Sequence, residues 1–362
     1  MYEAVTVESK SEWKQFLALP AKIYAKHGPA IPLPAFEVRR LLDTDSNPAL
    51  RMRTTLLLLV RRDGEPVGRC SLVMPGSSAE ATAVFGFFEC LDDQYAADTL
   101  LNHAEEVCRS RGVRAIHGPF SPTTSGQTGI QLDRYDETTV LYEACSPPYY
   151  SPLLEKAGYA LEQIGRTWRN VTLRADMDAL IARLPHRPSR YHIRQVSLTG
   201  LQRGVDDLAR VFEIAFSENW SREAMSAEEY LYVARFLLPA WRPDSFTIVC
   251  DDEQPVGAAV CFPDINAAFR SGNGSARAVA LFNARRQAGS SRSLLMFVMG
   301  IHPSYQNSAA GLELARHVAG IARNYETMHS TWITEGNSAS ERMASRFGLA
   351  PWKTFGVYRK NF

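Results

Sequence analysis

The stretch that decides the fold is Gly300-Ile301-His302-Pro303-Ser304-Tyr305-Gln306-Asn307-Ser308-Ala309-Ala310-Gly311. It lies between an apolar, strand-like segment at residues 294–299 and a segment at 311–324 whose apolar residues recur at helical spacing. The start of a helix presents unpaired backbone N–H groups and the positive end of the helix dipole, which together favour an anion. Small side chains at Ala309 and Gly311 would let the backbone approach a pyrophosphate closely. An ordinary strand-to-helix loop explains this stretch equally well.

The surroundings of this stretch occur twice, about half a chain apart. Asp63-Gly64-Glu65-Pro66-Val67-Gly68 matches Asp252-Glu253-Gln254-Pro255-Val256-Gly257, and an apolar run follows each copy. Each copy reads as a strand, a tight polar turn and a strand. A strand, an amphipathic helix, a strand and a short helix then follow at residues 83–88, 96–110, 114–117 and 151–159, and again at 294–299, 311–324, 330–334 and 339–349. The repeat predicts two similar α/β units in tandem.

The bulk properties agree with two globular domains. A chain of 362 residues is too long for one ordinary core, and 45% apolar with 22% charged residues is typical of globular proteins. The net charge of +1 provides no overall field for a polyanion, which argues against nucleic acid as a partner. The six cysteines have neither the CxxC spacing nor the Cys/His pairing of a zinc site, so no metal is expected.

The beginning of the chain is charged and mixed, unlike a signal peptide, and the longest apolar run is too short for a membrane span. With cysteines in apolar runs, where a thiol behaves as a small core residue, we expect a reduced, cytoplasmic protein. Peripheral contact with a membrane stays open, and the basic residues at 186–194 are either a solvated linker or a contact for phosphate groups.

The loop resembles the acyl-CoA loop of the GNAT superfamily, Gln/Arg-x-x-Gly-x-Gly/Ala. Gln306, Ala309 and Gly311 match this motif, with Ala in place of its first Gly. Trp332-Ile333-Thr334-Glu335-Gly336-Asn337 and the helix after it resemble the superfamily's fifth strand and following helix. Nearly the whole chain is similar to a bacterial family of tandem-GNAT proteins. The segments that carry this likeness include Gly86-Phe87-Phe88-Glu89-Cys90, Asp92-Asp93, Gly118-Pro119, Pro148-Tyr149-Tyr150, Asn219-Trp220, Pro263-Asp264 and Lys353-Thr354-Phe355.

The resemblance implies an α/β (α+β) fold with two tandem GNAT-like domains, each a mixed, mostly antiparallel twisted sheet flanked by helices. We place an N-terminal domain at residues 1–180 and a C-terminal domain, with the acyl-CoA site, at 190–362. The first half lacks a Gln/Arg-x-x-Gly-like loop, and Asp92 and Asp93 would repel a pyrophosphate. The first domain is therefore predicted to be non-catalytic.

The same resemblance implies a cofactor site made by the end of the strand, the loop and Asn337, which would face the CoA arm. The predicted cofactor-binding residues are Met299, Ile301, Gln306, Asn307, Ser308, Ala309, Ala310, Gly311 and Asn337. Acyl-CoA would bind as a co-substrate, and no permanently bound cofactor is expected.

Amide formation from a thioester needs a neutral amine, a polarised carbonyl and a protonated leaving thiol. In a GNAT fold, backbone N–H groups of residues 297–301 would polarise the carbonyl. Glu335, at a strand end, is the predicted base, and helix capping together with Asn337 is its alternative role. The Tyr that many GNAT enzymes use as the acid is replaced by Ala344, so Tyr358, Tyr305 or water would have to serve.

The acceptor is expected beside the turn after residues 258–262 and after the helix at 206–216. The predicted substrate-binding residues are Asn219, Trp220, Asp264, Asn266 and Trp332. Asp264 could hold an ammonium group or form an Asx turn, and Trp220 could line a pocket or belong to the core.

Together these features predict an acyl-CoA-dependent N-acyltransferase that acts on an amine of a small molecule or lipid. Transfer of a long acyl chain to a sphingoid base is its special case. Two alternatives remain open. One is a transferase that uses aminoacyl-tRNA on the same fold, against which the near-zero net charge counts. The other is a non-catalytic acyl-CoA or lipid sensor, which Ala309 and Ala344 favour.

Overall fold

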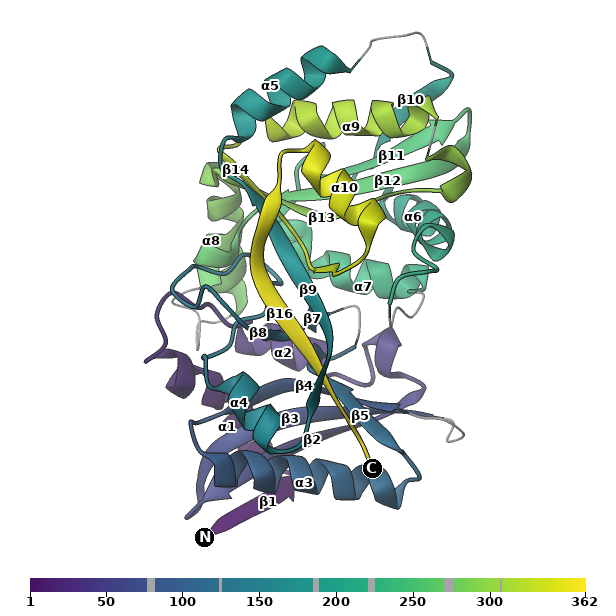
Figure 1. Cartoon of the computed structure of the whole chain (residues 1–362). Coiled ribbons are helices and arrows are strands. Elements are labelled where there is room, and N and C mark those ends of the chain that lie inside the picture. Colours follow the sequence, from purple (N-terminus) through teal and green to yellow (C-terminus); the bar gives the residue numbers. More distant parts are fainter. Residues whose placement is uncertain (77–81, 124–125, 185–188, 221–224, 270–276, 307) are drawn as a thin grey trace. The chain divides into compact units, whose positions relative to one another are not determined.

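The computed structural model describes residues 1–362 except 77–81, 124–125, 185–188, 221–224, 270–276 and 307 (Figure 1). The chain divides into two compact units. Unit 1 comprises Met1–Gly165, Phe269–Arg277 and Lys353–Phe362, and unit 2 comprises Arg166–Ala268 and Ala278–Trp352. These units differ from the predicted domains 1–180 and 190–362, because residues 166–180 belong to unit 2 and the end of the chain returns to unit 1. That residues 1–180 and 190–362 each fold as an independent domain stays a prediction.

Unit 1 contains a sheet with the strand order β1-β2-β3-β4-β5-β16. All neighbours are antiparallel except β4 and β5, which are parallel. The strands of this unit are β1 (Tyr2–Thr6), β2 (Arg53–Arg62), β3 (Glu65–Pro75), β4 (Thr82–Cys90), β5 (Ala115–Gly118), β6 (Phe120–Ser121), β7 (Gln127–Thr128), β8 (Ile130–Gln131) and parts of β9 (Ala160–Asn170) and β16 (Ala350–Asn361). Its helices are α1 (Lys10–Tyr24), α2 (Ala35–Leu41), η1 (Pro48–Leu50), α3 (Gln94–Ser110) and α4 (Tyr150–Lys156).

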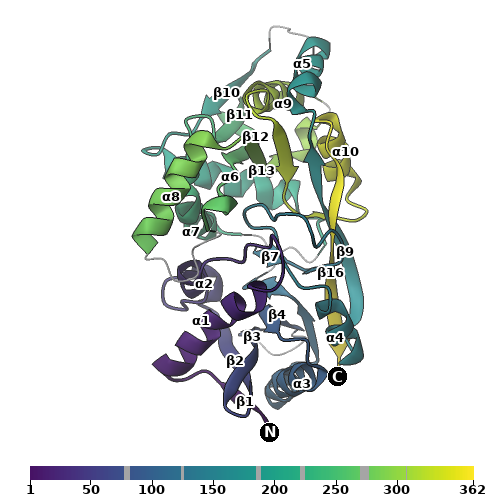
Figure 2. The same ribbon diagram turned by 90° about the vertical axis from the view of Figure 1, so that its left-hand side faces the viewer.

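Side chains alternate between two cores along the strands of unit 1, as the two-residue period of a strand requires. On β2, Leu58 and Val60 pack in the core that includes α3, whereas Leu57 and Leu59 pack in the core that includes α1 and α2. Figure 2 shows α1 and α3 on opposite sides of these strands. The near-continuous apolar run of β2 is explained by this burial on both faces.

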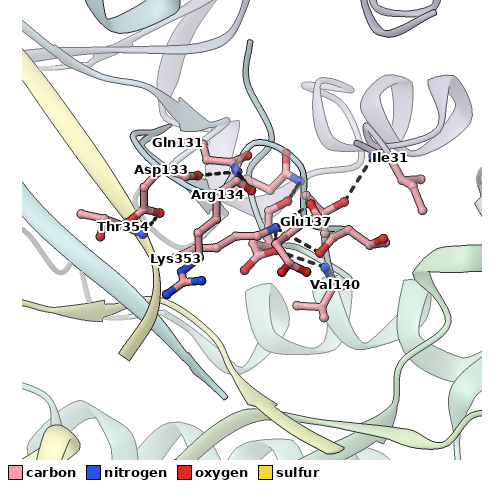
Figure 3. A network of polar contacts seen from close by, with 12 residues as sticks. Ile31, Gln131, Asp133, Arg134, Glu137, Val140, Lys353 and Thr354 are labelled. Carbon is pink, nitrogen blue, oxygen red and sulfur yellow. Dashed lines mark hydrogen bonds and ion pairs between the residues drawn. The ribbon is translucent and has the colours of Figure 1, made fainter. Parts of the chain in front are cut away.

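The last strand, β16, is fixed in unit 1 by a buried polar network (Figure 3). The Lys353 ammonium donates to the carbonyls of Glu137 and Thr138 at 3.2 and 3.0 Å and to the Glu143 carboxylate at 2.9 Å. The next residue, Thr354, donates its N–H to Asp133 at 2.8 Å. Every donor of the ammonium has a partner, so this network is structural.

Unit 2 contains a sheet with the order β14-β13-β12-β11-β10, in which only β13 and β14 are parallel. Its strands are β10 (Tyr191–Gln195), β11 (Phe246–Asp251), β12 (Gln254–Pro263), β13 (Ser293–Ile301), β14 (Thr327–Ser330) and β15 (Ile333–Thr334). Its helices are α5 (Leu173–Arg183), α6 (Leu201–Ala215), α7 (Ala227–Leu237), η2 (Leu238–Ala240), η3 (Asn266–Phe269), α8 (Arg277–Ser290), η4 (Pro303–Tyr305), α9 (Ala309–Ala322) and α10 (Ser338–Arg346), with the ends of η3 and α8 assigned to unit 1.

The helices α9 and α6 cover opposite faces of this sheet (Figure 1). Leu314 and Val318 of α9 share a core with Ala259 and Cys261 of β12. On the other face, Phe212 of α6 lies over Gly300.

Both units follow the order that the repeat predicts, and the fold prediction is confirmed. In each, an antiparallel hairpin, β2–β3 or β11–β12, is followed by a third strand, a helix and a strand parallel to the third. Asp63, Gly64 and Asp252 have φ of 51°, 85° and 50° at the two hairpin turns, a conformation that Gly, Asn and Asp tolerate best. Among the described residues, no helix is both long and apolar enough to cross a membrane.

Candidate active site in unit 2

An opening in the sheet of unit 2 begins in the middle of β13. β14 pairs with β13 only from Ser293 to Met296. Beyond that point the ladder pairs β13 with β12 alone, in the part of the chain that the structure describes. The register with β12 steps from Val298 to Met296, which leaves Phe297 as the extra residue of a β-bulge at the point where the two parallel strands part.

The end of β13 turns backbone N–H groups toward this opening. The N–H of His302 donates to the Val256 carbonyl on β12 at 2.8 Å. Alternate residues of an antiparallel strand bond to the same neighbour, so the N–H of Gly300 points to β12 as well. The N–H groups of Met299 and Ile301 therefore point to the opposite, open edge. This is the geometry that polarisation of a carbonyl along β13 requires.

The loop after β13 leads through η4 into α9, as predicted. Ser308 caps α9, and its hydroxyl accepts the N–H of Ala310 at 3.1 Å. The N–H groups of Ala309 and Gly311 have no acceptor among the residues that the structure describes. These two donors and the positive end of the helix dipole point out of the helix, where an anion would be stabilised. Asn307, another predicted cofactor contact, lies outside the described residues.

Space around the loop agrees with a ligand site. Among the described residues, a Cβ added at Gly311 would meet the Gln306 carbonyl alone, at 3.9 Å, so their packing does not require glycine here. Ala309 is not among the residues with positive φ, so Ala fits where the family motif has Gly. Gln306 and Ala309 are exposed. The loop therefore leaves room for a pyrophosphate and offers it unpaired donors.

The predicted substrate residues Asn219 and Trp220 meet the segment 332–337. The Asn337 amide donates to the Asn219 side-chain oxygen at 3.0 Å, and the rings of Trp220 and Trp332 lie 6.2 Å apart. The indole Nε1 of Trp332 is buried and has no partner within the described part of the chain.

This cluster borders the opening between β13 and β14. Thr331, which precedes Trp332, donates to the Met296 and Phe297 carbonyls at 3.3 and 2.9 Å. Phe216, just before Asn219, lies against Gly300. At this place the Trp332 indole N–H would donate a hydrogen bond to a hydroxyl group of the acceptor substrate.

Glu335 follows β15 and is about half exposed, with 47% of its side chain accessible. One carboxylate oxygen accepts from Arg166 of β9 at 2.6 Å. The helix α10 is capped by Asn337, whose side chain accepts the N–H of Ser340 at 3.1 Å. Capping therefore does not need Glu335, and its role as the base stays a prediction.

Asp264 and Asn266 lie at the other end of β13. Asp264 donates its N–H to the Ser293 carbonyl at 2.8 Å, and its carboxylate accepts the N–H of Asn266 at 3.1 Å in an Asx turn. Ser293 is four residues from the bulge at Phe297, which corresponds to about 13 Å along a strand. The structure thus does not bring this pair together with Trp332 and Asn337.

The two tyrosines proposed as the acid lie in different units. Tyr358 is in unit 1, 1% exposed, with its hydroxyl 2.6 Å from the Ser151 hydroxyl, and burial raises its pKa. Tyr305 is in η4 of unit 2, where burial and Asp251 raise its pKa. Ala344, which stands where many GNAT enzymes have their tyrosine, is buried in the core of unit 2. The identity of the acid stays a prediction.

The sequence reasoning missed Arg166, the partner of Glu335. The two residues are 169 positions apart, and β9 was assigned to the first domain. No local signal predicts this pair, because it depends on β9 lying beside β14 through Arg169 and Asn170.

A parallel strand pair that parts at a bulge, next to a helix whose first N–H groups face an anion site, is typical of the GNAT fold. Residues 205–349 match the model of the Acetyltransferase (GNAT) family. The chain is 25% identical over 372 residues to a protein of Caulobacter vibrioides named bacterial ceramide synthase, covering 98% of this chain and 96% of that protein. It is 24% identical to Protein YghO of Escherichia coli, with 98% and 94% covered.

Among solved structures, a tandem GNAT protein from the clavulanic acid biosynthesis pathway superposes with a TM-score of 0.58 at 15% identity, covering 100% of this chain and 98% of that one. A GCN5-related N-acetyltransferase from Sphaerobacter thermophilus gives a TM-score of 0.53 at 13% identity, with 99% and 95% covered. These likenesses concern the fold. The chain therefore carries a match to the GNAT family mostly within unit 2, aligns with two bacterial relatives over nearly its full length, and resembles a tandem GNAT protein in its fold.

Proposed function

We propose that the protein is an acyl-CoA-dependent N-acyltransferase whose reaction takes place in unit 2. The observation that carries the proposal is the set of backbone donors without acceptors among the described residues, Met299 and Ile301 on β13 and Ala309 and Gly311 at the start of α9. A thioester carrier with a diphosphate needs donors at both places, for its carbonyl and for its phosphates.

In the proposed reaction the acceptor amine attacks the thioester carbonyl, the C–N bond forms and the C–S bond breaks. The N–H groups of Met299 and Ile301 would stabilise the negative charge on the carbonyl oxygen. Glu335 would take the proton from the ammonium group, directly or through water, and the leaving thiolate would take a proton from a tyrosine or from water. Asn337 would orient the CoA arm.

For the acceptor we propose a sphingoid base, and for the acyl group a long chain. Support comes from the relative named bacterial ceramide synthase, which aligns with nearly the full length of this chain at 25% identity. The aromatic pair Trp220 and Trp332 beside the opening suits an apolar chain next to the reacting amine. The carboxamides of Asn219 and Asn337 lie next to it and suit the hydroxyl groups of such a base.

The test is binding of CoA and palmitoyl-CoA by calorimetry to the full-length protein and to Gly311→Glu. The new carboxylate would stand at the helix start, and we expect at least a tenfold loss of affinity for both ligands. Gly320→Glu is the matched control, because it places the same charge on the same helix at a glycine with open space around it. Equal binding by the two variants, or no binding of either ligand to the unaltered protein, would refute the proposed site. Binding without turnover of any long-chain amine would identify a sensor instead.

A further inference from the structure

A second recess lies within unit 1, separate from the elements of the proposed acyl-CoA site. Its volume is about 510 Å³ including its open mouth. Apolar walls come from Leu33, Val38, Phe87, Phe88 and Ile130. Recesses that combine apolar walls with a few polar groups are the usual form of small-molecule sites.

A buried guanidinium lines this recess. The side chain of Arg69 is 3% exposed and lies over the Phe16 ring at 4.6 Å. One of its N–H groups donates to the Phe16 carbonyl at 2.6 Å. Its Nε has no partner within the described residues, and the Glu89 carboxylate lies 3.8 Å away, too far for a hydrogen bond. A buried Arg with unused donors is costly unless water or a ligand supplies acceptors.

Three polar side chains of the recess already accept hydrogen bonds, whereas some of its donors have no partner among the described residues. Glu89 accepts the Tyr150 hydroxyl at 2.7 Å. Ser121 and Ser146, which also line the recess, accept backbone N–H groups at 3.0 and 2.8 Å. Neither serine hydroxyl donates its own hydrogen to any residue that the structure describes. The Arg69 Nε–H and the two serine hydroxyls are therefore donors without partners among the described residues, and a ligand that pairs with them would bring acceptors.

The backbone beside the recess is held in an unusual geometry. Phe87, a residue with a bulky side chain, has φ of 46° next to a β-bulge between β3 and β4. A Cβ at the preceding Gly86 would lie 1.8 Å from the Phe120 carbonyl, so the segment after β5 packs directly on this bulge. Strained residues of this kind cluster at ligand sites, and here the strain places Phe87 in the wall of the recess.

We propose that unit 1 binds a small monocarboxylate with a short apolar tail, with its carboxylate on Arg69 and the hydroxyls of Ser121 and Ser146. A guanidinium pairs with a carboxylate through two parallel hydrogen bonds, and the apolar walls take the tail. Burial raises the pKa of Glu89 to about 7, so this neighbour is half neutral near that pH and repels an added anion less than an ordinary carboxylate would. The charged or titratable groups that face Glu89 are Arg69, Tyr24, Tyr149, Tyr150, Cys90 and Cys145.

The test is binding of hexanoate to the full-length protein by calorimetry in excess CoA, with hexylamine as the opposite-charge probe. We expect saturable binding of one hexanoate and none of hexylamine. Affinity should fall roughly tenfold from pH 6 to pH 8, because a carboxyl with a pKa of about 7 loses most of its proton in that interval. Glu89→Gln should keep the binding and lose this pH dependence.

The double variant Arg69→Met/Glu89→Gln removes both buried charges, so it leaves no unpaired ion that would prevent folding. It should lose at least tenfold in hexanoate affinity while its circular dichroism spectrum is unchanged. Arg292→Met, at an exposed ion pair in unit 2, is the control and should bind as the unaltered protein does. Unchanged hexanoate binding by the double variant, tighter binding of hexylamine than of hexanoate, or no binding of hexanoate would each overturn the proposal.

Discussion

Replacing Lys353 by methionine should destabilise the protein by an amount that depends on Glu143. The two side chains are 0% and 2% exposed and 2.9 Å apart, and Lys353 also donates to two backbone carbonyls. Methionine keeps most of the stem of the side chain and removes its charge. The Glu143 carboxylate then stays buried without the ammonium group, although it still accepts the Val140 N–H at 3.2 Å.

Breaking a buried ion pair from one side costs about 3–5 kcal/mol, because an uncompensated charge remains. Removing both charges in Lys353→Met/Glu143→Gln should cost much less, about 1–2 kcal/mol, since only the hydrogen bonds to the two carbonyls are lost. The coupling energy between the two sites should therefore be at least about 2 kcal/mol.

The assay is urea unfolding of the full-length protein, followed by circular dichroism and tryptophan fluorescence. Lys22→Ala, at an exposed pair 3.8 Å from Glu65, serves as the control and should change stability by less than about 0.5 kcal/mol. If the single and double variants at Lys353 lose the same stability, the charge on Glu143 is not what the lysine compensates, and the reasoning is wrong.

Two further predictions concern carboxylates. If Glu335 is the base, Glu335→Gln should lower kcat for an amine acceptor at least a hundredfold. The control is Glu326→Gln, at an exposed residue of the same unit, which should leave kcat unchanged. Turnover is measured by the release of the CoA thiol. Burial raises the pKa of Glu89 from 4.5 to about 7, so its contribution to stability is complete below pH 4.5 and is lost as the pH rises through 7. In urea unfolding, the free energy of unfolding of Glu89→Gln relative to the unaltered protein should rise by about 3 kcal/mol between pH 4.5 and 8. A difference in stability that does not change with pH would contradict the raised pKa of Glu89.

The parts of the fold that the sequence predicts are those with a local signal. The hairpin turns at Asp63 and Asp252 carry turn residues between apolar strands, and the loop before Gly311 lies between two segments with clear periodicity. The structure confirms each of these elements, within a few residues at their ends. Local sequence is enough here because the deciding interactions span only a few residues.

The parts that the sequence does not predict depend on contacts between distant segments. The helix α8 was missed, since its alternation of buried alanines with exposed Val279 and Phe282 gives no apolar stripe. The return of β16 to unit 1 combines pairing with β5 and the contacts of Lys353, whose partners lie more than 200 positions away. A single lysine in a strand carries no sign that it is buried, because lysine is nearly always exposed.

The helix that follows the third strand begins differently in the two units. From this difference we predict how many CoA molecules one chain binds. Three residues, 91–93, connect β4 to α3, whereas seven, 302–308, connect β13 to α9. Asp93 caps α3 by accepting the Ala96 N–H at 3.2 Å, and its other oxygen accepts from Tyr2 and Arg62 at 2.7 and 2.8 Å.

A carboxylate therefore already occupies the place at α3 where a diphosphate would sit, and it would repel one. The neutral Ser308 at α9 accepts one N–H, and the N–H groups of Ala309 and Gly311 have no acceptor within the described part of the chain. We expect calorimetry to give one CoA per chain, and Gly311→Glu to lose that single site. Two equal sites, or one site that survives Gly311→Glu, would mean that unit 1 holds the coenzyme in a way that the capped helix α3 does not suggest.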